Sequence, residues 1–143
     1  MTDNKVKITI DGDVHSVDKS KMLIEITDEL GIYIPRFCYH EKLSIAANCR
    51  MCLVEVENSN NALPACATPV SDGMVVNTQS SSSKTAQEST MEFLLINHPL
   101  DCPICDQGGE CELQDLAYSY GKNNSRFDLL KQTKPNDDLG PLV

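Results

Sequence analysis

The sequence contains no apolar stretch of the length that a membrane-spanning helix requires. Its longest local apolar run, residues 93–96, is far shorter than the roughly 20 residues that cross a bilayer. The N-terminus shows neither the basic segment nor the apolar core of a secretory signal, and no transit peptide is visible. We therefore expect no direct membrane insertion and a reducing, cytoplasmic environment.

Basic residues are also scarce. The chain has 12 lysines and arginines against 21 aspartates and glutamates, which gives a formal net charge of −9. Binding to nucleic acid or to anionic lipid needs clustered cations that displace counterions, so this charge argues against both kinds of partner. Neither a glycine-rich phosphate loop nor a nucleophile–base pair in a persuasive context is present. We predict no substrate active site within this chain.

Cysteine, by contrast, is abundant, and its distribution is the most informative feature of the chain. Seven cysteines and one histidine form two groups of four, which are Cys38, Cys49, Cys52 and Cys66, and then His98, Cys102, Cys105 and Cys111. In a reducing compartment, cysteine-rich chains more often bind metal than form disulfides, and an odd number of thiols fits a disulfide framework poorly. Two four-ligand metal sites account for every cysteine and point to iron–sulfur clusters and electron transfer.

The first group has the ligand chemistry of an iron–sulfur site. Cys49 and Cys52 form a Cys-x2-Cys pair, which supplies two thiolates from one tight loop whose amides can donate to inorganic sulfides. Cys38 comes from upstream and Cys66 from a later predicted strand, so the site closes only when the domain has folded. The spacing is not the plant-type Cys-x4-Cys-x2-Cys. Zinc also accepts four thiolates, although structural zinc sites usually offer two short pairs, and it remains an alternative.

The second group combines a close pair, Cys102 and Cys105, with Cys111 and His98. The intervening Gly108-Gly109 lets the backbone approach a bulky inorganic core. Three thiolates and an imidazole can also bind zinc. In a [4Fe–4S] site, a neutral imidazole in place of a thiolate removes one negative charge, which should raise the reduction potential, and it makes the ligand proton-sensitive.

Two other basic side chains, His40 and Arg50, are candidate accessories. His40, two residues from Cys38, is expected to hydrogen-bond near the first group rather than to replace a cysteine ligand. Arg50 could partly neutralise cluster charge, or it could form an ordinary salt bridge with one of the many acids. His15 falls in a predicted strand and is expected at the surface.

The first half of the sequence predicts a small α+β domain. Alternating apolar residues over 6–10, followed by an Asp-Gly-Asp turn, predict a β-hairpin over residues 6–10 and 14–17. A short helix is expected over residues 21–30, with Asp18 or Ser20 as its cap. A long loop at 35–52 carries three of the first four ligands, and further strands are expected over residues 52–56, 63–67 and 74–78.

The second half predicts a helical segment. The four serines at 80–83 mark the clearest boundary and suit either a linker or a helix cap. Helices are expected over residues 84–97 and 113–120, so the second ligand group bridges two helices. We predict an α+β domain at 1–79, a helical domain with the second ligand group at 80–125 and a tail at 126–143.

Nearly the whole chain resembles the N-terminal part of the large iron–sulfur subunit of NADH:quinone oxidoreductase, respiratory complex I, known as the G subunit in bacteria and the 75 kDa subunit in mitochondria. The resembling segments are residues 34–40, 48–56 and 98–111. The last is the most specific, because one histidine and three cysteines around Asp-Gln-Gly-Gly-Glu are hard to obtain by chance. Ala47 departs from the glycine more often expected there. The family also continues past residues 139–143 into further cysteine-bound clusters and a molybdopterin-type domain, so we expect a fragment.

The resemblance implies a β-grasp domain that holds a [2Fe–2S] cluster through Cys38, Cys49, Cys52 and Cys66, followed by a helical segment that holds a [4Fe–4S] cluster through His98, Cys102, Cys105 and Cys111. It implies an electron-transfer subunit of NADH dehydrogenase (quinone), which relays electrons from NADH through FMN on a neighbouring subunit towards quinone. The implied partners are the other subunits of that enzyme. The implied location is peripheral, on the cytoplasmic face of the inner membrane.

Two other functions stay open. Iron-only hydrogenases and some NAD-linked formate dehydrogenases share both ligand groups, so these residues could form the electron inlet of a catalytic subunit. Downstream sequence would discriminate, because a hydrogenase must supply further cysteines for its catalytic cluster. A zinc-stapled interaction module without redox function would be colourless, whereas iron–sulfur clusters are brown.

Overall fold

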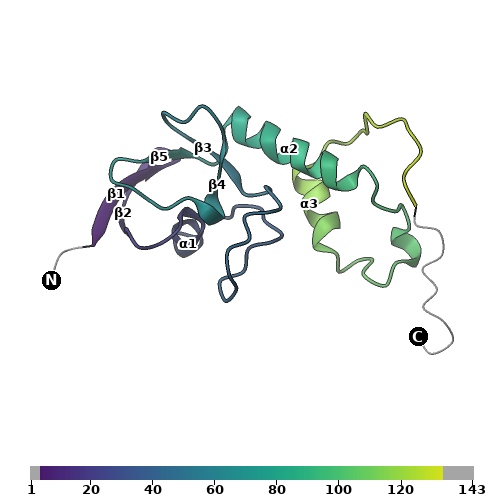
Figure 1. Ribbon diagram of the computed structural model, residues 1–143, viewed down its shortest axis with the longest axis horizontal. Helices are drawn as coiled ribbons and strands as arrows, with labels where there is room; N and C mark the ends of the chain where they lie inside the picture. The colour runs from purple at the N-terminus through teal and green to yellow at the C-terminus, as the bar shows by residue number, and fades with distance from the viewer. Residues whose placement is uncertain (1–3, 134–143) are drawn as a thin grey trace.

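A five-stranded mixed sheet and a short helix make up the first part of the protein, in a computed structural model that describes residues 4–133. Strands β1 (Lys5–Ile10) and β2 (Asp13–Asp18) pair antiparallel, with Ile8 opposite His15, which is the predicted hairpin. Figure 1 shows this sheet with helix α1 beside it, and helix α2 leading away to a second, helical part. The predicted α+β class is confirmed.

The order of strands in the sheet is β2-β1-β5-β3-β4. Strand β5 (Val75–Asn77) runs parallel to β1, and β3 (Leu53–Val56) pairs antiparallel with β5 and with β4 (Leu63–Pro64). Apolar residues of these strands and of α1 (Leu23–Glu29) form the first core, which includes Ile8, Ile10, Leu23, Ile26, Val54 and Val76. Both Cys52 and Cys66 belong to this core.

The predicted cap of the first helix is wrong. The Asp18 carboxylate accepts hydrogen bonds from the backbone N–H of Ser20 at 2.9 Å and from its hydroxyl at 2.7 Å, so both residues stabilise the turn before the helix. The helix begins after Met22, whose backbone N–H donates to the Glu25 carboxylate at 2.6 Å. The Glu25 carboxylate, at the third position of the helix, therefore accepts the hydrogen bond of the residue before the helix, as in a capping box.

The strand predicted over residues 63–67 is only partly present. Strand β4 ends at Pro64, and the chain then forms a one-turn 3-10 helix, η1 (Ala65–Ala67). Proline has no backbone N–H with which to continue a ladder, so a break near this point is expected physically. Cys66 consequently lies on a turn rather than on a strand.

The serine run caps a helix and is not a linker. Helix α2 (Ser81–Leu95) starts inside it, and the Ser80 hydroxyl oxygen accepts a hydrogen bond from the Ser83 backbone N–H at 3.1 Å. The Ser83 hydroxyl accepts from the Glu55 backbone N–H and donates to the Asn77 carbonyl, both at 2.9 Å. One buried hydroxyl thus joins the start of α2 to strands β3 and β5.

Helix α2 and helix α3 (Glu112–Tyr120) pack together around a second core. Its buried members are Met51, Met91 and Leu116. Met51 comes from the loop between Cys49 and Cys52, so the helical part packs directly on the loop that carries the first ligand group. Within residues 4–133, no helix has the length and apolar character that spanning a membrane requires.

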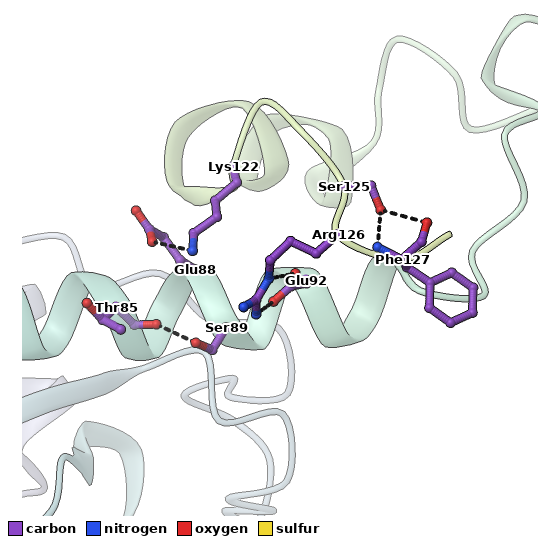
Figure 2. A network of polar contacts seen from close by, with 8 residues as sticks. All are labelled: Thr85, Glu88, Ser89, Glu92, Lys122, Ser125, Arg126 and Phe127. Atoms are coloured by element: carbon purple, nitrogen blue, oxygen red, sulfur yellow. Dashed lines mark hydrogen bonds and ion pairs between the residues drawn. The ribbon is translucent and has the colours of Figure 1, made fainter. Parts of the chain in front are cut away.

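The segment after α3 returns along α2, as Figure 2 shows. Arg126 donates to both carboxylate oxygens of Glu92, at 2.7 Å from Nε and 2.5 Å from Nη2. Lys122 lies 3.6 Å from the Glu88 carboxylate, one turn earlier on the same helix. Two ion pairs therefore attach this segment to the solvent-facing side of α2.

The same segment also caps the C-terminal end of α2. The Lys131 ammonium group donates to the carbonyl oxygens of Leu95 at 2.7 Å and of Ile96 at 2.9 Å. A cation at a helix C-terminus satisfies carbonyls that have no partner within the helix. The first residues of the tail predicted at 126–143 thus pack on α2, and residues 134–143 lie outside the described residues.

Candidate iron–sulfur centres

The four cysteines of the first group come together beside the first core. The backbone N–H of Cys49 donates to the Cys38 sulfur at 3.4 Å. The N–H of Ala65 donates to the Cys52 carbonyl at 2.9 Å, which brings the η1 turn and its Cys66 against the Cys-x2-Cys loop. Cys52 and Cys66 are each 1% exposed, whereas Cys38 and Cys49 are half-buried. The site therefore has two buried thiols and two nearer the surface.

Electrostatic interactions link these thiols to one another. The pKa of Cys66 is raised to about 12. The main cause is burial of the thiol, followed by its interaction with the Cys52 thiol and then by the charges of Cys38 and Cys49. Cys66 is consequently a protonated thiol at neutral pH in the metal-free protein. Because metals bind thiolates, loading of this site must release that proton.

The loop at Cys49 lowers the pKa of its thiol. Burial alone would raise the pKa of Cys49, but hydrogen bonds with the backbone at Met51, Cys38 and Phe37 outweigh it, so the pKa lies below its usual value. Backbone N–H groups that stabilise a negative sulfur are what an iron–sulfur site needs, because hydrogen bonds to the sulfurs also tune its potential.

Two residues of this loop adopt left-handed backbone conformations. The φ angles of Ala47 and Arg50 are +48° and +60°, in a region that residues with a Cβ adopt at a cost. The Arg50 carbonyl accepts a hydrogen bond from the Thr90 hydroxyl of α2 at 3.3 Å, which helps to hold the bend. The Arg50 side chain is exposed, and the ion pairs found within residues 4–133 do not include it.

All four residues of the second group line one cavity of about 410 Å³. His98 follows the end of α2 by three residues, and its backbone N–H donates to the Leu95 carbonyl at 3.3 Å. Cys102 starts the 3-10 turn η2 (Cys102–Ile104), Cys105 follows that turn, and Cys111 is the N-cap of α3. The second group thus bridges two helices, although α2 ends at Leu95 rather than near residue 97.

Gly108 keeps the second loop compact. Its backbone N–H donates to the Cys105 carbonyl at 2.9 Å, and a Cβ built on Gly108 would lie 2.4 Å from the Cys102 carbonyl oxygen. A side chain at this position would therefore force the loop open. The thiolate-rich donor set and the close backbone fit an inorganic core. Cys102 and Cys105 are exposed, unlike the buried thiols of the first group.

The residues of the second group converge on the scale of a cavity. Among residues 4–133, no three histidine, cysteine, aspartate or glutamate side chains lie close enough together to hold a single metal ion. A zinc ion needs its donors about 2.0–2.3 Å from one centre, whereas cluster ligands surround a core of several atoms. All seven cysteines lie within the described residues, and all are free thiols.

The remaining histidines lie apart from these contacts. His40 is exposed, and its Nδ1 accepts a hydrogen bond from the Lys42 backbone N–H at 3.1 Å. That bond stabilises a turn. The partner of His40 is therefore the Lys42 backbone and not a group next to the ligand cysteines, as the sequence had led us to expect. His15 lies half-buried on β2.

Sequence reasoning missed two side chains next to the first group, Met51 and Arg36. Met51 is fully buried in the second core, and Arg36 pairs with Asp28 of α1. The only sequence signal for Met51 is an apolar residue between two ligand cysteines, which does not reveal what it packs against.

Comparison with known proteins identifies the family. Residues 3–81, which include the first group, match the family model of the 2Fe-2S iron-sulfur cluster binding domain. The chain belongs to this family. Residues 87–126, which include the second group, match the model of the NADH-ubiquinone oxidoreductase-G iron-sulfur binding region. The two expected cofactors of this 2Fe-2S family member, one [2Fe–2S] and one [4Fe–4S] cluster, are thereby confirmed.

Two relatives confirm the resemblance to the large iron–sulfur subunit. The chain is 52% identical over 138 residues to the G subunit of NADH-quinone oxidoreductase from Rickettsia felis, covering 96% of this chain and 21% of that protein. It is 52% identical over 141 residues to the mitochondrial 78 kDa subunit of NADH-ubiquinone oxidoreductase from Neurospora crassa, covering 97% and 19%. The chain therefore spans about a fifth of the length of the curated relatives that it matches.

A solved structure shares the fold. A chain in the crystal structure of NAD+-reducing [NiFe]-hydrogenase in the H2-reduced state superposes with a TM-score of 0.80 at 28% identity. The match covers 91% of this chain and 55% of that chain. This hydrogenase differs from the iron-only class that the sequence left open.

Proposed function

We propose that this chain is an electron-relay region of a respiratory NADH:quinone oxidoreductase, within a large iron–sulfur subunit of the G or 75 kDa type. The observation that carries the proposal is that each ligand group lies in its own matched region, with a hydrogen bond from the Cys49 N–H to the Cys38 sulfur in the first group and one cavity lined by all four residues of the second. When bound, iron–sulfur clusters accept and donate single electrons. In this function the chain needs no substrate pocket of its own.

The proposed ligands of the [2Fe–2S] cluster are Cys38, Cys49, Cys52 and Cys66. Support comes from the mutual proximity of the four thiols and from the backbone hydrogen bonds that favour a thiolate at Cys49. The buried pair, Cys52 and Cys66, excludes water from one side of the site. Low solvent access is one of the factors that set a cluster's potential.

The proposed ligands of the [4Fe–4S] cluster are His98, Cys102, Cys105 and Cys111. Support comes from the single cavity that all four line and from the close backbone at Gly108. A neutral imidazole contributes no negative charge, so His98 is expected to hold this site at a higher potential than a fourth thiolate would.

The fold and the division of the chain belong to the same proposal. We assign a β-grasp, ferredoxin-like domain to residues 1–79 and a helical domain with one histidine and three cysteine ligands to residues 80–125. The mixed sheet with α1 supports the first assignment, and the α2–α3 pair supports the second. The bond network at Ser83 implies that the two domains do not move freely against each other.

The proposed partners are the other subunits of the respiratory enzyme, including the one that binds NADH and FMN. The proposed location is the cytoplasmic face of the inner membrane, with attachment through those subunits. Relatives named as subunits of NADH-quinone and NADH-ubiquinone oxidoreductases support the proposal that partner subunits exist.

A second candidate function is the electron inlet of a NAD-linked hydrogenase, which the structural match to a NAD+-reducing [NiFe]-hydrogenase favours. Sequence identity separates the two candidates, at 28% for that chain and 52% for the respiratory subunits. We therefore retain the respiratory function as the main proposal.

The ligand assignment is tested one group at a time. Cys66→Ala and Cys105→Ala are each reconstituted anaerobically, with His15→Ala as a control that alters a residue outside both groups. EPR spectra of the reduced proteins should show that Cys66→Ala loses only the [2Fe–2S] signal and that Cys105→Ala loses only the [4Fe–4S] signal. Retention of both signals in either cysteine variant would refute the assignment.

The relay itself is tested with the NADH- and FMN-binding subunit of a related respiratory enzyme. We expect NADH to reduce the clusters of this chain when that subunit is present and not when it is absent. Failure of NADH to reduce them in the mixture, while dithionite does so, would contradict the proposed partner.

A further inference from the structure

Arg36 joins the segment that carries Cys38 to helix α1. Its Nη1 and Nη2 donate to the two carboxylate oxygens of Asp28, at 2.6 Å and 2.5 Å. The Arg36 side chain is 17% exposed and that of Asp28 is 41% exposed, so solvent reaches this fork-to-fork pair mainly from the carboxylate side. Two parallel charge-assisted bonds fix the orientation of the guanidinium group as well as its position.

Two tyrosine rings flank the same guanidinium group. The Arg36 Cζ lies 5.5 Å from the ring centroid of Tyr33 and 5.7 Å from that of Tyr39. Both distances are within the range of a cation–π contact. Since Tyr39 directly follows Cys38, Arg36 holds the residue next to a proposed ligand.

The neighbours of Cys38 pack into different cores. Phe37 packs against the second core, and Tyr39 packs against the first core. The Cys38 sulfur accepts the Cys49 N–H at 3.4 Å. The backbone around Cys38 is thus anchored on both sides, and Arg36 is the polar contact that ties this segment to α1.

We propose that Arg36 is a positioning residue for the [2Fe–2S] site and that it acts by holding the Cys38 thiol in place. This inference rests on the proposed function, in which Cys38 is a cluster ligand. The guanidinium group is suited to the role because it is planar, stacks on aromatic rings and binds a carboxylate through two parallel bonds. A lysine would keep the charge and lose both the fork and the stacking.

The test compares Arg36→Lys with Arg126→Lys. Arg126 is a matched control, because it also forms a bidentate pair, with Glu92 of α2, but neither residue belongs to the segments that carry the first group. Both variants keep the net charge. Both are reconstituted anaerobically, and the loss of the [2Fe–2S] EPR signal is followed over time in the presence of an iron chelator.

We expect Arg36→Lys to lose the [2Fe–2S] signal about tenfold faster than the unmodified protein and to show a changed EPR line shape, since contacts that orient ligands typically change metal affinity by about this factor or more. Arg126→Lys should match the unmodified protein in both readouts. If an ion pair were merely structural, its loss in the variant would lower the melting temperature without changing the EPR line shape.

Equal loss rates and unchanged line shapes in Arg36→Lys and Arg126→Lys would overturn the inference. If Arg36→Lys does not fold, Asp28→Asn removes the charge of the partner and leaves the arginine between its tyrosines, and the same faster loss is expected. A loss rate in Asp28→Asn equal to that of the unmodified protein would likewise overturn it. Absence of a [2Fe–2S] signal in the unmodified protein would instead refute the ligand assignment, and with it this inference.

Discussion

Replacement of Met51 by alanine tests whether the two parts of the protein share one core. Met51 is fully buried, and it contacts side chains of α2 and α3 from within the Cys-x2-Cys loop. Removal of a buried methionine side chain costs about 2–5 kcal/mol, and the cost is highest where the surroundings cannot collapse. Met51 lies between a hydrogen-bonded loop and two packed helices, so the surroundings cannot readily collapse. We therefore expect Met51→Ala to lower the unfolding free energy of the metal-free protein by about 3 kcal/mol.

Urea denaturation followed by far-ultraviolet circular dichroism measures this change. Phe93→Ala is the matched control, because Phe93 lies on the same helix α2 and is 75% exposed. Its unfolding free energy should change by no more than about 0.5 kcal/mol. A loss below about 1 kcal/mol in Met51→Ala would refute the argument, because it would mean that the helical part does not pack on the ligand loop.

Three further predictions concern the two loops. Ala47→Gly should raise the unfolding free energy by about 0.5–1 kcal/mol, because glycine relieves the left-handed backbone strain and this gain exceeds its entropic cost. Ala46→Gly is the control, and a greater stabilisation by Ala46→Gly than by Ala47→Gly would contradict the account. Gly108→Ala should abolish the [4Fe–4S] EPR signal, because its Cβ meets the Cys102 carbonyl at 2.4 Å, while the [2Fe–2S] signal of the same sample persists; full loading of both sites would show that the loop can open. His98→Cys should keep the [4Fe–4S] cluster and lower its midpoint potential in a redox titration, because a thiolate restores negative charge; an unchanged or higher potential would be the opposite result.

Local patterns in the sequence were sufficient for most elements. The hairpin at β1 and β2 follows from alternating apolar residues in β1 and from the Asp-Gly-Asp turn, and α2 and α3 follow from apolar residues at helical spacing. The convergence of the second group was also predictable, because His98 to Cys111 is a short segment whose ends are set by two helices. In these cases the determining contacts are close in sequence.

Contacts between distant residues account for what could not be predicted. The Ser83 hydroxyl acts as a bridge between β3 and β5, which no pattern near residue 83 indicates. Met51 packs on helices that lie well downstream in the chain, and the tail returns to α2 through Arg126 and Lys131. The mispredicted cap of α1 is a local exception, because Asp18 and Ser20 bond to each other and leave the helix start to Glu25.

The central claim is that two groups of thiol and imidazole side chains hold two polynuclear iron–sulfur cores. The most direct test is the analysis of iron, acid-labile sulfide and zinc in the anaerobically reconstituted chain. The account predicts about six irons and about six sulfides per chain, which is the sum for one [2Fe–2S] and one [4Fe–4S] cluster. About two zinc ions per chain without sulfide would contradict it.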